Sequence, residues 1–254
     1  MLPNYLHVGG AKCASTWLWT VYQEHPEIYV NPDVDNLNFF VGDYNRGLDW
    51  YEQTYFAETA GHRVVGDMSN SYMVFRPALE RAARHLSDAT RVTVTVRNPL
   101  DRTLIHWAHM KLLKQWSPEQ HMELADMLDV HLWQLFLMWA GPSFFGSHVE
   151  SVYDYFPRDR VLVLFYEDLV ENPDSFLANI FEFLGVDKGF KPSVLHERVG
   201  FPYGTKAADH PTEHDTSLVD DGYPAGMRER LRALFDDDIR KLERLTGRDL
   251  SHWS

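Results

Sequence analysis

The chain has 254 residues, of which 44% are hydrophobic and 14% aromatic, so it carries enough apolar side chains for a buried core, which excludes a disordered protein. Its formal net charge of −13 excludes a general attraction to nucleic acid, anionic membranes or polyanionic polysaccharides. One cysteine, Cys13, excludes an intrachain disulfide, and no segment reads as a signal peptide or a membrane span, so we expect a cytoplasmic protein without a membrane or nucleic-acid partner.

Short apolar segments alternate along the chain with amphipathic segments of helical spacing. The predicted strands cover residues 5–8, 63–66, 91–96 and 161–165. The predicted helices cover residues 15–22, 78–86, 99–113, 130–139, 174–184 and 228–245. This alternation predicts an α/β fold, a P-loop-like central parallel sheet flanked by helices, in one domain over residues 1–254. Residues 197–223 lack periodicity and are rich in Gly, Pro, His and Asp, which predicts a long loop.

The turn between the first predicted strand and helix has the composition of an anion site. It reads Gly9-Gly10-Ala11-Lys12-Cys13-Ala14-Ser15-Thr16-Trp17. Glycines let the backbone approach a phosphate, and the free amides and dipole of a helix N-terminus favour negative charge. A lysine and two hydroxyls add further donors, so we predict phosphate binding rather than a turn of purely structural role.

The same turn departs from the loop of magnesium-dependent nucleotide kinases. That motif needs Gly-Lys-Ser/Thr in direct succession, because the hydroxyl after the lysine holds magnesium. Here Cys13 follows Lys12 and no second glycine directly precedes the lysine. A nucleotide-dependent phosphotransferase therefore remains only an alternative, which a magnesium requirement with ATP turnover would support.

A second polar segment lies where the predicted strand 91–96 ends and a helix begins. Arg97 stands at the strand end, where open parallel sheets bind their ligands. Asn98 suits a helix N-cap and Pro99 suits the first helical position. We expect Arg97 to face a ligand crevice, and Asn98 and Pro99 to start the helix.

Together these segments resemble sulfotransferases that use 3'-phosphoadenosine 5'-phosphosulfate (PAPS). The first segment is similar to the family's 5'-phosphosulfate loop, Pro-Lys-Ser-Gly-Thr-Thr-Trp. Lys12, Thr16 and Trp17 match it, Ser15 stands for the first Thr and Ala14 for the Gly. The second segment resembles the family's 3'-phosphate region, which carries Arg-Asp-Pro and then a Ser eight residues after the Arg. Residues 164–169 and 242–253 resemble a scaffold strand and the C-terminal tail of the family, so the likeness spans nearly the whole chain.

In the second segment Arg97, Pro99 and Arg102 match the family pattern, whereas Ile105 occupies the Ser position and cannot donate to a phosphate. The resemblance implies a PAPS-dependent sulfotransferase with PAPS as co-substrate and no metal, in which Lys12 neutralises charge on the leaving phosphate. The cofactor-binding residues that we assign are Gly10, Ala11, Lys12, Cys13, Ala14, Ser15, Thr16, Trp17, Arg97, Arg102 and Lys206.

The catalytic base is sought in the pattern of the heparan-type branch, where a Glu shortly before Phe-Phe removes the acceptor proton. The Phe39-Phe40 pair aligns that Glu with Asn36, which is a poor base, so we favour the adjacent Asp35 and keep Asp33 in reserve. Asp67 and His106 are the next candidates. Asp67 matches the acidic residue of that branch's Gly-Glu-Lys-Ser-Pro-Ser-Tyr segment, and His106 is chosen because a histidine titrates near neutral pH.

The acceptor is inferred from the middle of the chain, where residues 106–145 are dense in Met and aromatic side chains. Flexible Met and flat aromatic faces suit an apolar ligand, and the negative net charge disfavours a polyanion. We therefore expect sulfation of a hydroxyl on a small, partly apolar acceptor such as a secondary metabolite. A carbohydrate sulfotransferase is one alternative. A catalytically inactive nucleotide-binding protein of the same fold is another, motivated by Asn36, Met68 and Ile105.

Overall fold

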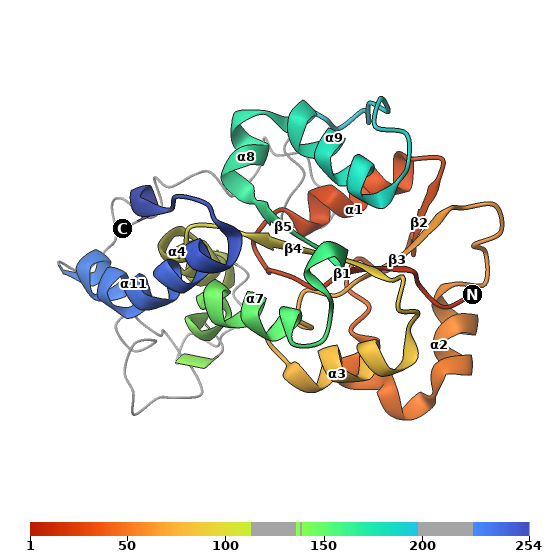
Figure 1. Ribbon diagram of the computed structural model, residues 1–254, viewed down its shortest axis with the longest axis horizontal. Helices are drawn as coiled ribbons and strands as arrows, with labels where there is room; N and C mark the ends of the chain where they lie inside the picture. The colour runs from red at the N-terminus through yellow and green to blue at the C-terminus, as the bar shows by residue number, and fades with distance from the viewer. Residues whose placement is uncertain (113–135, 138, 198–225, 254) are drawn as a thin grey trace. The chain divides into compact units, whose positions relative to one another are not determined.

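The computed structural model describes residues 1–112, 136–137, 139–197 and 226–253 (Figure 1). The chain forms two compact units. The first combines residues 1–96 with 151–208, and the second combines residues 97–150 with 209–254. The predicted helix over 130–139 lies mostly outside the described residues, and the predicted loop over 197–223 lies almost wholly outside them.

The first unit is built on a five-stranded parallel sheet. Its strands are β1 (Tyr5–His7), β2 (Ile28–Val30), β3 (Val64–Met68), β4 (Arg91–Val96) and β5 (Val161–Phe165). They lie in the order β2-β3-β1-β4-β5, and every pair is parallel, with Tyr5 opposite both Gly66 and Arg91. The predicted α/β fold with a central parallel sheet is confirmed. The sequence prediction missed β2, a strand of three residues.

Helices cover both faces of this sheet (Figure 1). The helices α1 (Ser15–Glu24) and α9 (Pro173–Leu184) lie on one side, and α3 (Arg76–His85) lies on the other. Two shorter helices, α2 (Leu48–Tyr55) and α8 (Tyr166–Glu171), also belong to the unit and were not predicted. Both carry many polar side chains and bury one residue each, Tyr51 and Tyr166, so their apolar spacing is too weak to read. Short helical turns cover Phe39–Asp43, Tyr44–Arg46 and Arg158–Arg160.

The core beneath α1 follows from the spacing of its apolar residues. Trp17, Leu18, Val21 and Tyr22 are buried, as expected for one helical stripe. Trp17 meets Phe176 of α9 with ring centroids 6.4 Å apart, and its indole N–H donates to the Val194 carbonyl at 3.1 Å. Burying such side chains contributes roughly 1.5–3 kcal/mol each, which fixes α1 on the sheet and with it the loop that precedes the helix.

The second unit contains α4 (Pro99–Leu112), α11 (Met227–Thr246), two 3-10 turns (Gly141–Ser143 and Ser251–Trp253) and most of α7 (Phe145–Tyr153). The side chain of Asn98 accepts a hydrogen bond from the Leu100 N–H at 3.0 Å, as expected for the residue that starts α4. Among the described residues, no helix of the chain is long and apolar enough to cross a membrane.

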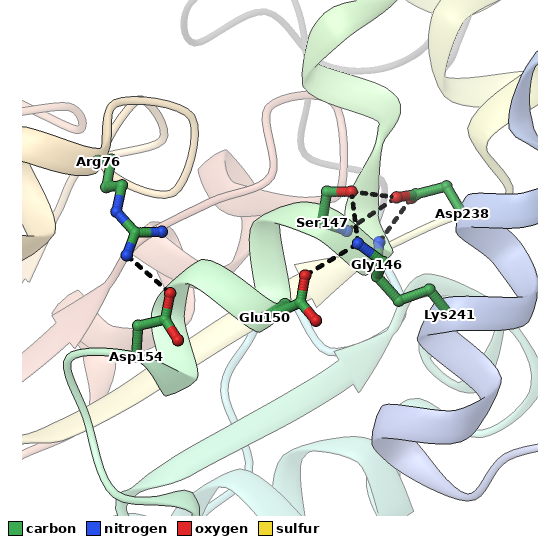
Figure 2. A network of polar contacts seen from close by, with 7 residues as sticks. All are labelled: Arg76, Gly146, Ser147, Glu150, Asp154, Asp238 and Lys241. Atoms are coloured by element: carbon green, nitrogen blue, oxygen red, sulfur yellow. Dashed lines mark hydrogen bonds and ion pairs between the residues drawn. The ribbon is translucent and has the colours of Figure 1, made fainter.

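A carboxylate on α11 holds the start of α7 (Figure 2). Asp238 accepts from the Gly146 N–H at 2.7 Å, and from the N–H and hydroxyl of Ser147 at 2.8 and 2.7 Å. The backbones approach so closely that a Cβ on Gly146 would lie 2.3 Å from the Asp238 carbonyl oxygen. Lys241 pairs with Glu150 at 2.8 Å beside this contact. The other pair drawn in Figure 2, Arg76 with Asp154 at 2.8 Å, belongs to the first unit.

A buried histidine in β1 makes the stability of the fold depend on pH. His7 is fully buried, its Nδ1 bonds the Thr93 hydroxyl at 3.0 Å, and its Nε2 has no partner among the described residues. Burial disfavours the charged imidazole and lowers the pKa of His7 from 6.5 to about 4. Because the unfolded chain then binds more protons than the folded one, stability is lost as the pH falls from about 6.5 towards 4.

We expect this loss to reach about 3 kcal/mol in the free energy of unfolding, at about 1.4 kcal/mol per unit of pKa. Urea unfolding at several pH values measures it, with a His7→Asn variant as control because Asn can keep the bond to Thr93. Because other groups also titrate in this range, the quantity to compare between the wild type and the variant is the slope of the free energy of unfolding against pH. If the variant kept the wild-type slope over this pH range, another group would be responsible.

Candidate active site

The order of the strands reverses beside β1, which is the kind of place where open parallel sheets bind ligands. From β1 the chain crosses to β2 in one direction, and from β4 it crosses to β5 in the other, so the order reverses between β1 and β4. Open α/β sheets bind ligands at the carboxyl ends of the strands at such a point. The pairing continues past β1, because Gly10 N–H donates to the Thr95 carbonyl and Thr95 N–H donates to the Gly9 carbonyl, both at 2.7 Å.

The loop after β1 is tightly wound. Gly9 has a φ of 143°, and a Cβ there would lie 2.8 Å from the side chain of Met73 and 3.0 Å from the Asn70 carbonyl oxygen. Lys12 and Ala14 have φ values of 68° and 67°, in the left-handed region. Such a conformation costs a residue with a Cβ roughly 1–2 kcal/mol, and strained backbone of this kind clusters at ligand sites. Ala14 occupies the place of the glycine in the pattern that the loop resembles.

The N-terminus of α1 is open. Its first main-chain hydrogen bond runs from Leu18 N–H to the Ala14 carbonyl at 3.0 Å. In the described part of the chain, the N–H groups of Ser15, Thr16 and Trp17 have no acceptor, and no side chain caps the helix at Ala14. The first turn contains no acidic side chain. Three aligned N–H groups with the helix dipole behind them form a site for an anionic oxygen.

The predicted loop residues lie around this helix end with different exposures. Gly10, Cys13 and Ala14 are buried, whereas Ala11, Lys12, Ser15 and Thr16 are half-buried. Trp17 contributes only its main chain at this end, since its indole lies in the core. Lys12 and the two hydroxyls are therefore the polar side chains that the loop presents near the open N–H groups.

Residues 35–40, which we call the acceptor segment because the sequence predicts the base for the acceptor proton there, are hydrogen-bonded to the end of β3 and the turn that follows it. Leu37 N–H donates to the Met68 carbonyl at 3.0 Å, and Asn38 N–H donates to the Ser69 hydroxyl at 2.9 Å. Phe40 N–H donates to the Tyr72 hydroxyl at 3.2 Å. These bonds explain how the acceptor segment keeps a fixed place although it has no regular secondary structure before Phe39.

Asp67 joins these contacts into one network. Its carboxylate accepts from the hydroxyls of Ser69 at 2.5 Å and Tyr72 at 2.8 Å, and from that of Tyr51. The side chain is fully buried, and burial raises its pKa against the opposing effect of the three hydroxyls. The hydroxyls of Ser69 and Tyr72 also accept hydrogen bonds from main-chain N–H groups of the acceptor segment, so Asp67 holds that segment in place through them.

Two asparagines connect the acceptor segment with the phosphate loop. The side-chain oxygen of Asn36 accepts from the Asn70 N–H at 2.9 Å, and the side-chain nitrogen of Asn70 donates to the Ser15 hydroxyl at 3.0 Å. Asp35 precedes Asn36 and is half-buried. No described residue forms a hydrogen bond or ion pair with its carboxylate. Asp33 is exposed. The first unit thus brings Ser15, Asn36 and Asp35 into one neighbourhood.

The remaining described candidates belong to the second unit. Arg97 is 4% exposed and Arg102 is fully buried. Arg102 donates to the Trp139 carbonyl at 2.6 Å, the Ser143 hydroxyl at 3.3 Å and His106 Nδ1 at 2.7 Å. Since a guanidinium offers only N–H donors, His106 Nδ1 is an acceptor and its ring proton lies on Nε2. Ile105 is buried at 8% exposure. Lys206 and most of the Met-rich and aromatic segment lie outside the described residues.

Sequence reasoning missed the hydroxyls and the amide that hold the acceptor segment. They are Tyr51, Ser69, Asn70 and Tyr72. Three of them follow Asp67 within five positions, as Asp67-Met68-Ser69-Asn70-Ser71-Tyr72, and this run of donors just after a strand was a readable signal. Tyr51 comes from an unpredicted helix and had no such signal.

Comparison with known proteins gives the same assignment as these motifs. The family model described as a sulfotransferase domain matches residues 3–199. The mouse heparan sulfate glucosamine 3-O-sulfotransferase 3B1 is 26% identical over 262 residues, which cover 98% of this chain and 64% of that protein. The human bifunctional heparan sulfate N-deacetylase/N-sulfotransferase 3 is 24% identical over 73% of this chain and 22% of its own length. The chain thus spans about 64% of the length of the mouse heparan sulfate glucosamine 3-O-sulfotransferases 3B1 and 3A1.

Solved structures share the fold. A sulfotransferase from Alicyclobacillus acidocaldarius superposes with a TM-score of 0.78 at 23% identity and covers 100% of this chain and 99% of its own. The sulfotransferase domain from the curacin biosynthetic pathway gives a TM-score of 0.51 at 15% identity over 92% of this chain and 98% of its own. The resemblance found in the motifs is confirmed by the family match, and the chain belongs to the sulfotransferase family.

Proposed function

We propose that the protein transfers a sulfuryl group from PAPS to a hydroxyl of a small, partly apolar acceptor, with residues 1–254 acting as one sulfotransferase domain. The observation that carries this proposal is the open N-terminus of α1. Three N–H groups there have no acceptor among the residues that the structure describes, and together with Lys12 and the hydroxyls of Ser15 and Thr16 they fit the 5'-phosphosulfate group. The family match over residues 3–199, which includes parts of both units, supports the single domain.

The chemistry is an in-line displacement at sulfur. The acceptor oxygen forms a bond to sulfur while the bond from sulfur to the phosphate oxygen breaks, and its electron pair passes to that phosphate. Lys12 and the amides of α1 stabilise the charge that develops on the leaving phosphate. A base of the protein takes the acceptor proton. As the family resemblance implies, this assignment needs no metal.

Asp35 is the base that we favour, because the residue is half-buried and no described residue bonds to its carboxylate. The alternatives are hindered in different ways. Asp67 is fully buried and its oxygens already accept three hydroxyls, which suits an anchor better than a proton acceptor. His106 accepts from a guanidinium at the one ring nitrogen that could take a proton. These contacts support Asp35 over both.

For the second phosphate of the nucleotide we assign Arg97, which follows β4 directly in the chain. Arg102 serves a different role in this assignment. Its guanidinium is fully buried and donates to the Trp139 carbonyl, the Ser143 hydroxyl and the His106 imidazole. These bonds hold the segment around residues 139–143 against α4. Lys206 remains a predicted cofactor ligand.

Charge supports a small acceptor over a polysulfated polysaccharide. Between Lys12 and Arg46 the chain contains no Lys or Arg. The acceptor segment contains Asp35, and Asp33 lies two residues before it in the chain. A polyanion would be repelled there, and the net charge of −13 adds to that repulsion. The curated relatives are named for heparan sulfate, so a carbohydrate acceptor is the second candidate, and it would need cations from elsewhere in the chain.

The test is calorimetric titration with the desulfo product, 3'-phosphoadenosine 5'-phosphate, in the presence of EDTA, followed by turnover of PAPS with a panel of acceptors. We expect metal-independent binding and activity on phenols, hydroxylated polyketides or simple glycosides. Absence of nucleotide binding, or ATP binding that needs magnesium, would overturn the assignment. Turnover of heparan fragments alone would replace the small acceptor by a carbohydrate, and binding without any turnover would indicate an inactive nucleotide-binding protein.

A further inference from the structure

The contact between Asn70 and Ser15 links a residue outside the phosphate loop to one of the loop's hydroxyls. Asn70 follows β3, and its side-chain nitrogen donates to the Ser15 hydroxyl oxygen at 3.0 Å. Ser15 stands first in α1, beside the N–H groups that have no acceptor in the described structure. A hydroxyl that accepts on one side directs its own hydrogen to another side.

Asn70 is itself held in place from two directions. Its main-chain N–H donates to the Asn36 side-chain oxygen at 2.9 Å, which couples it to the acceptor segment. The Asn70 carbonyl oxygen lies 3.0 Å from the position that a Cβ on Gly9 would take, so the turn that contains Asn70 is in close contact with the phosphate loop. The neighbouring Ser69 N–H donates to the His7 carbonyl at 2.8 Å, which ties the same turn to β1.

The stability of the fold does not by itself explain the side chain of Asn70. Its side-chain oxygen is buried and has no hydrogen-bond partner among the described residues. A buried acceptor without a partner opposes folding, so it offsets what the bond to Ser15 contributes. Removal of the whole amide should therefore change stability little, and a role at the site remains as the reason for its placement.

We infer that Asn70 is a positioning residue of the sulfotransferase site, which orients the Ser15 hydroxyl to donate to the 5'-phosphate of the nucleotide. The inference rests on the proposed function, because it needs an anion at the N-terminus of α1. Asn70 does not touch the nucleotide in this assignment and acts through Ser15. In the segment Gly-Glu-Lys-Ser-Pro-Ser-Tyr that residues 66–72 resemble, this position is a proline, which has no side-chain amide and no N–H to give.

The first test is a double-mutant cycle on the affinity for 3'-phosphoadenosine 5'-phosphate, measured by calorimetry. We expect Asn70→Ala to weaken binding about three- to tenfold, the worth of one neutral hydrogen bond. In a Ser15→Ala background the same change should have no further effect, because the group that Asn70 orients is gone. Full additivity of the two changes would overturn the inference.

An isosteric variant separates orientation from space filling. In Asn70→Asp a carboxylate oxygen would accept the Ser15 hydrogen, turn it away from the phosphate and add repulsion to the anion. We expect this variant to bind at least about fivefold more weakly than Asn70→Ala. If Asn70 only filled space, the isosteric Asp would bind better than Ala, and the inference would be wrong.

The control is Asn172→Ala, which removes the cap of α9 at the Ser175 N–H and should lower stability without changing nucleotide affinity. It shows that a loss of stability does not by itself weaken binding. The wild type and Lys12→Ala complete the set. A wild type that binds no nucleotide would defeat the proposed function and this inference together. Weak binding by Lys12→Ala with wild-type affinity in both Asn70 variants would defeat this inference alone.

Discussion

Replacing Lys12 by alanine is expected to lower kcat about 10²- to 10³-fold and to weaken binding of 3'-phosphoadenosine 5'-phosphate by about 1.5–3 kcal/mol. Lys12 stands in the loop between β1 and α1, one residue before the buried Cys13, and is half-buried. Its ammonium would face charge that grows on the leaving phosphate as the bond to sulfur breaks. A group that meets growing charge stabilises the transition state more than the bound substrate, so kcat falls as well as affinity.

The alanine variant tests the charge alone, because it does not change the strain in the backbone at this position. Lys12 has a φ of 68°, and alanine keeps the Cβ that makes this conformation costly, so the loop is neither relieved nor further strained. Lys188→Ala is the matched control, since it removes the same charge from an exposed pair with Glu182. Single-turnover kinetics and calorimetry give the two quantities. A Lys12 variant with wild-type kcat would place the stabilising charge elsewhere.

The sequence predicted those strands and helices whose apolar residues recur with a clear period. The strands β1, β4 and β5 and the helices α1, α9 and α11 follow from apolar spacing and from end signals such as Gly185, whose φ of 73° ends α9. The strand β2 and the helices α2, α7 and α8 were missed. Their contacts are tertiary: α7, for example, starts where Asp238 supplies an acceptor from 91 residues away, which no local pattern shows.

The phosphate loop could be proposed from the sequence alone and stays a prediction, whereas the contacts of the acceptor segment could not be read from the sequence. A strand, glycines, a lysine and hydroxyls before a helix imply an anion site by local chemistry alone, and in the described residues the first N–H groups of α1 have no acceptor, which agrees with that prediction. The roles of Asp67 and Asn70 depend on which chain segment lies beside each. Burial and three hydroxyl partners favour an anchoring role for Asp67 over that of a base, and these contacts form only in the folded chain.

Asp35→Asn is expected to lower kcat about 10²- to 10⁴-fold while the affinity for the nucleotide stays near that of the wild type. Asparagine keeps the shape of the side chain and loses the ability to take the acceptor proton, so the chemical step alone should suffer. The matched control is Asp33→Asn, which makes the same change two residues away at an exposed position. Both variants raise the net charge by one, so a difference between them cannot come from charge alone.

Two further variants decide between the base and its rivals. Asp67→Asn should lower the free energy of unfolding, because three hydroxyls now donate to two carboxylate oxygens and the amide offers only one oxygen. The activity per folded molecule should stay near that of the wild type. His106→Gln should leave kcat within about tenfold, because the ring nitrogen facing Arg102 is already an acceptor and a glutamine amide can offer one too. If Asp35→Asn turned over at the wild-type rate while His106→Gln lost activity with nucleotide binding intact, the base would be the histidine. In that case Arg102 would have to release Nδ1 in the working enzyme, a movement that the pH dependence of kcat would reveal.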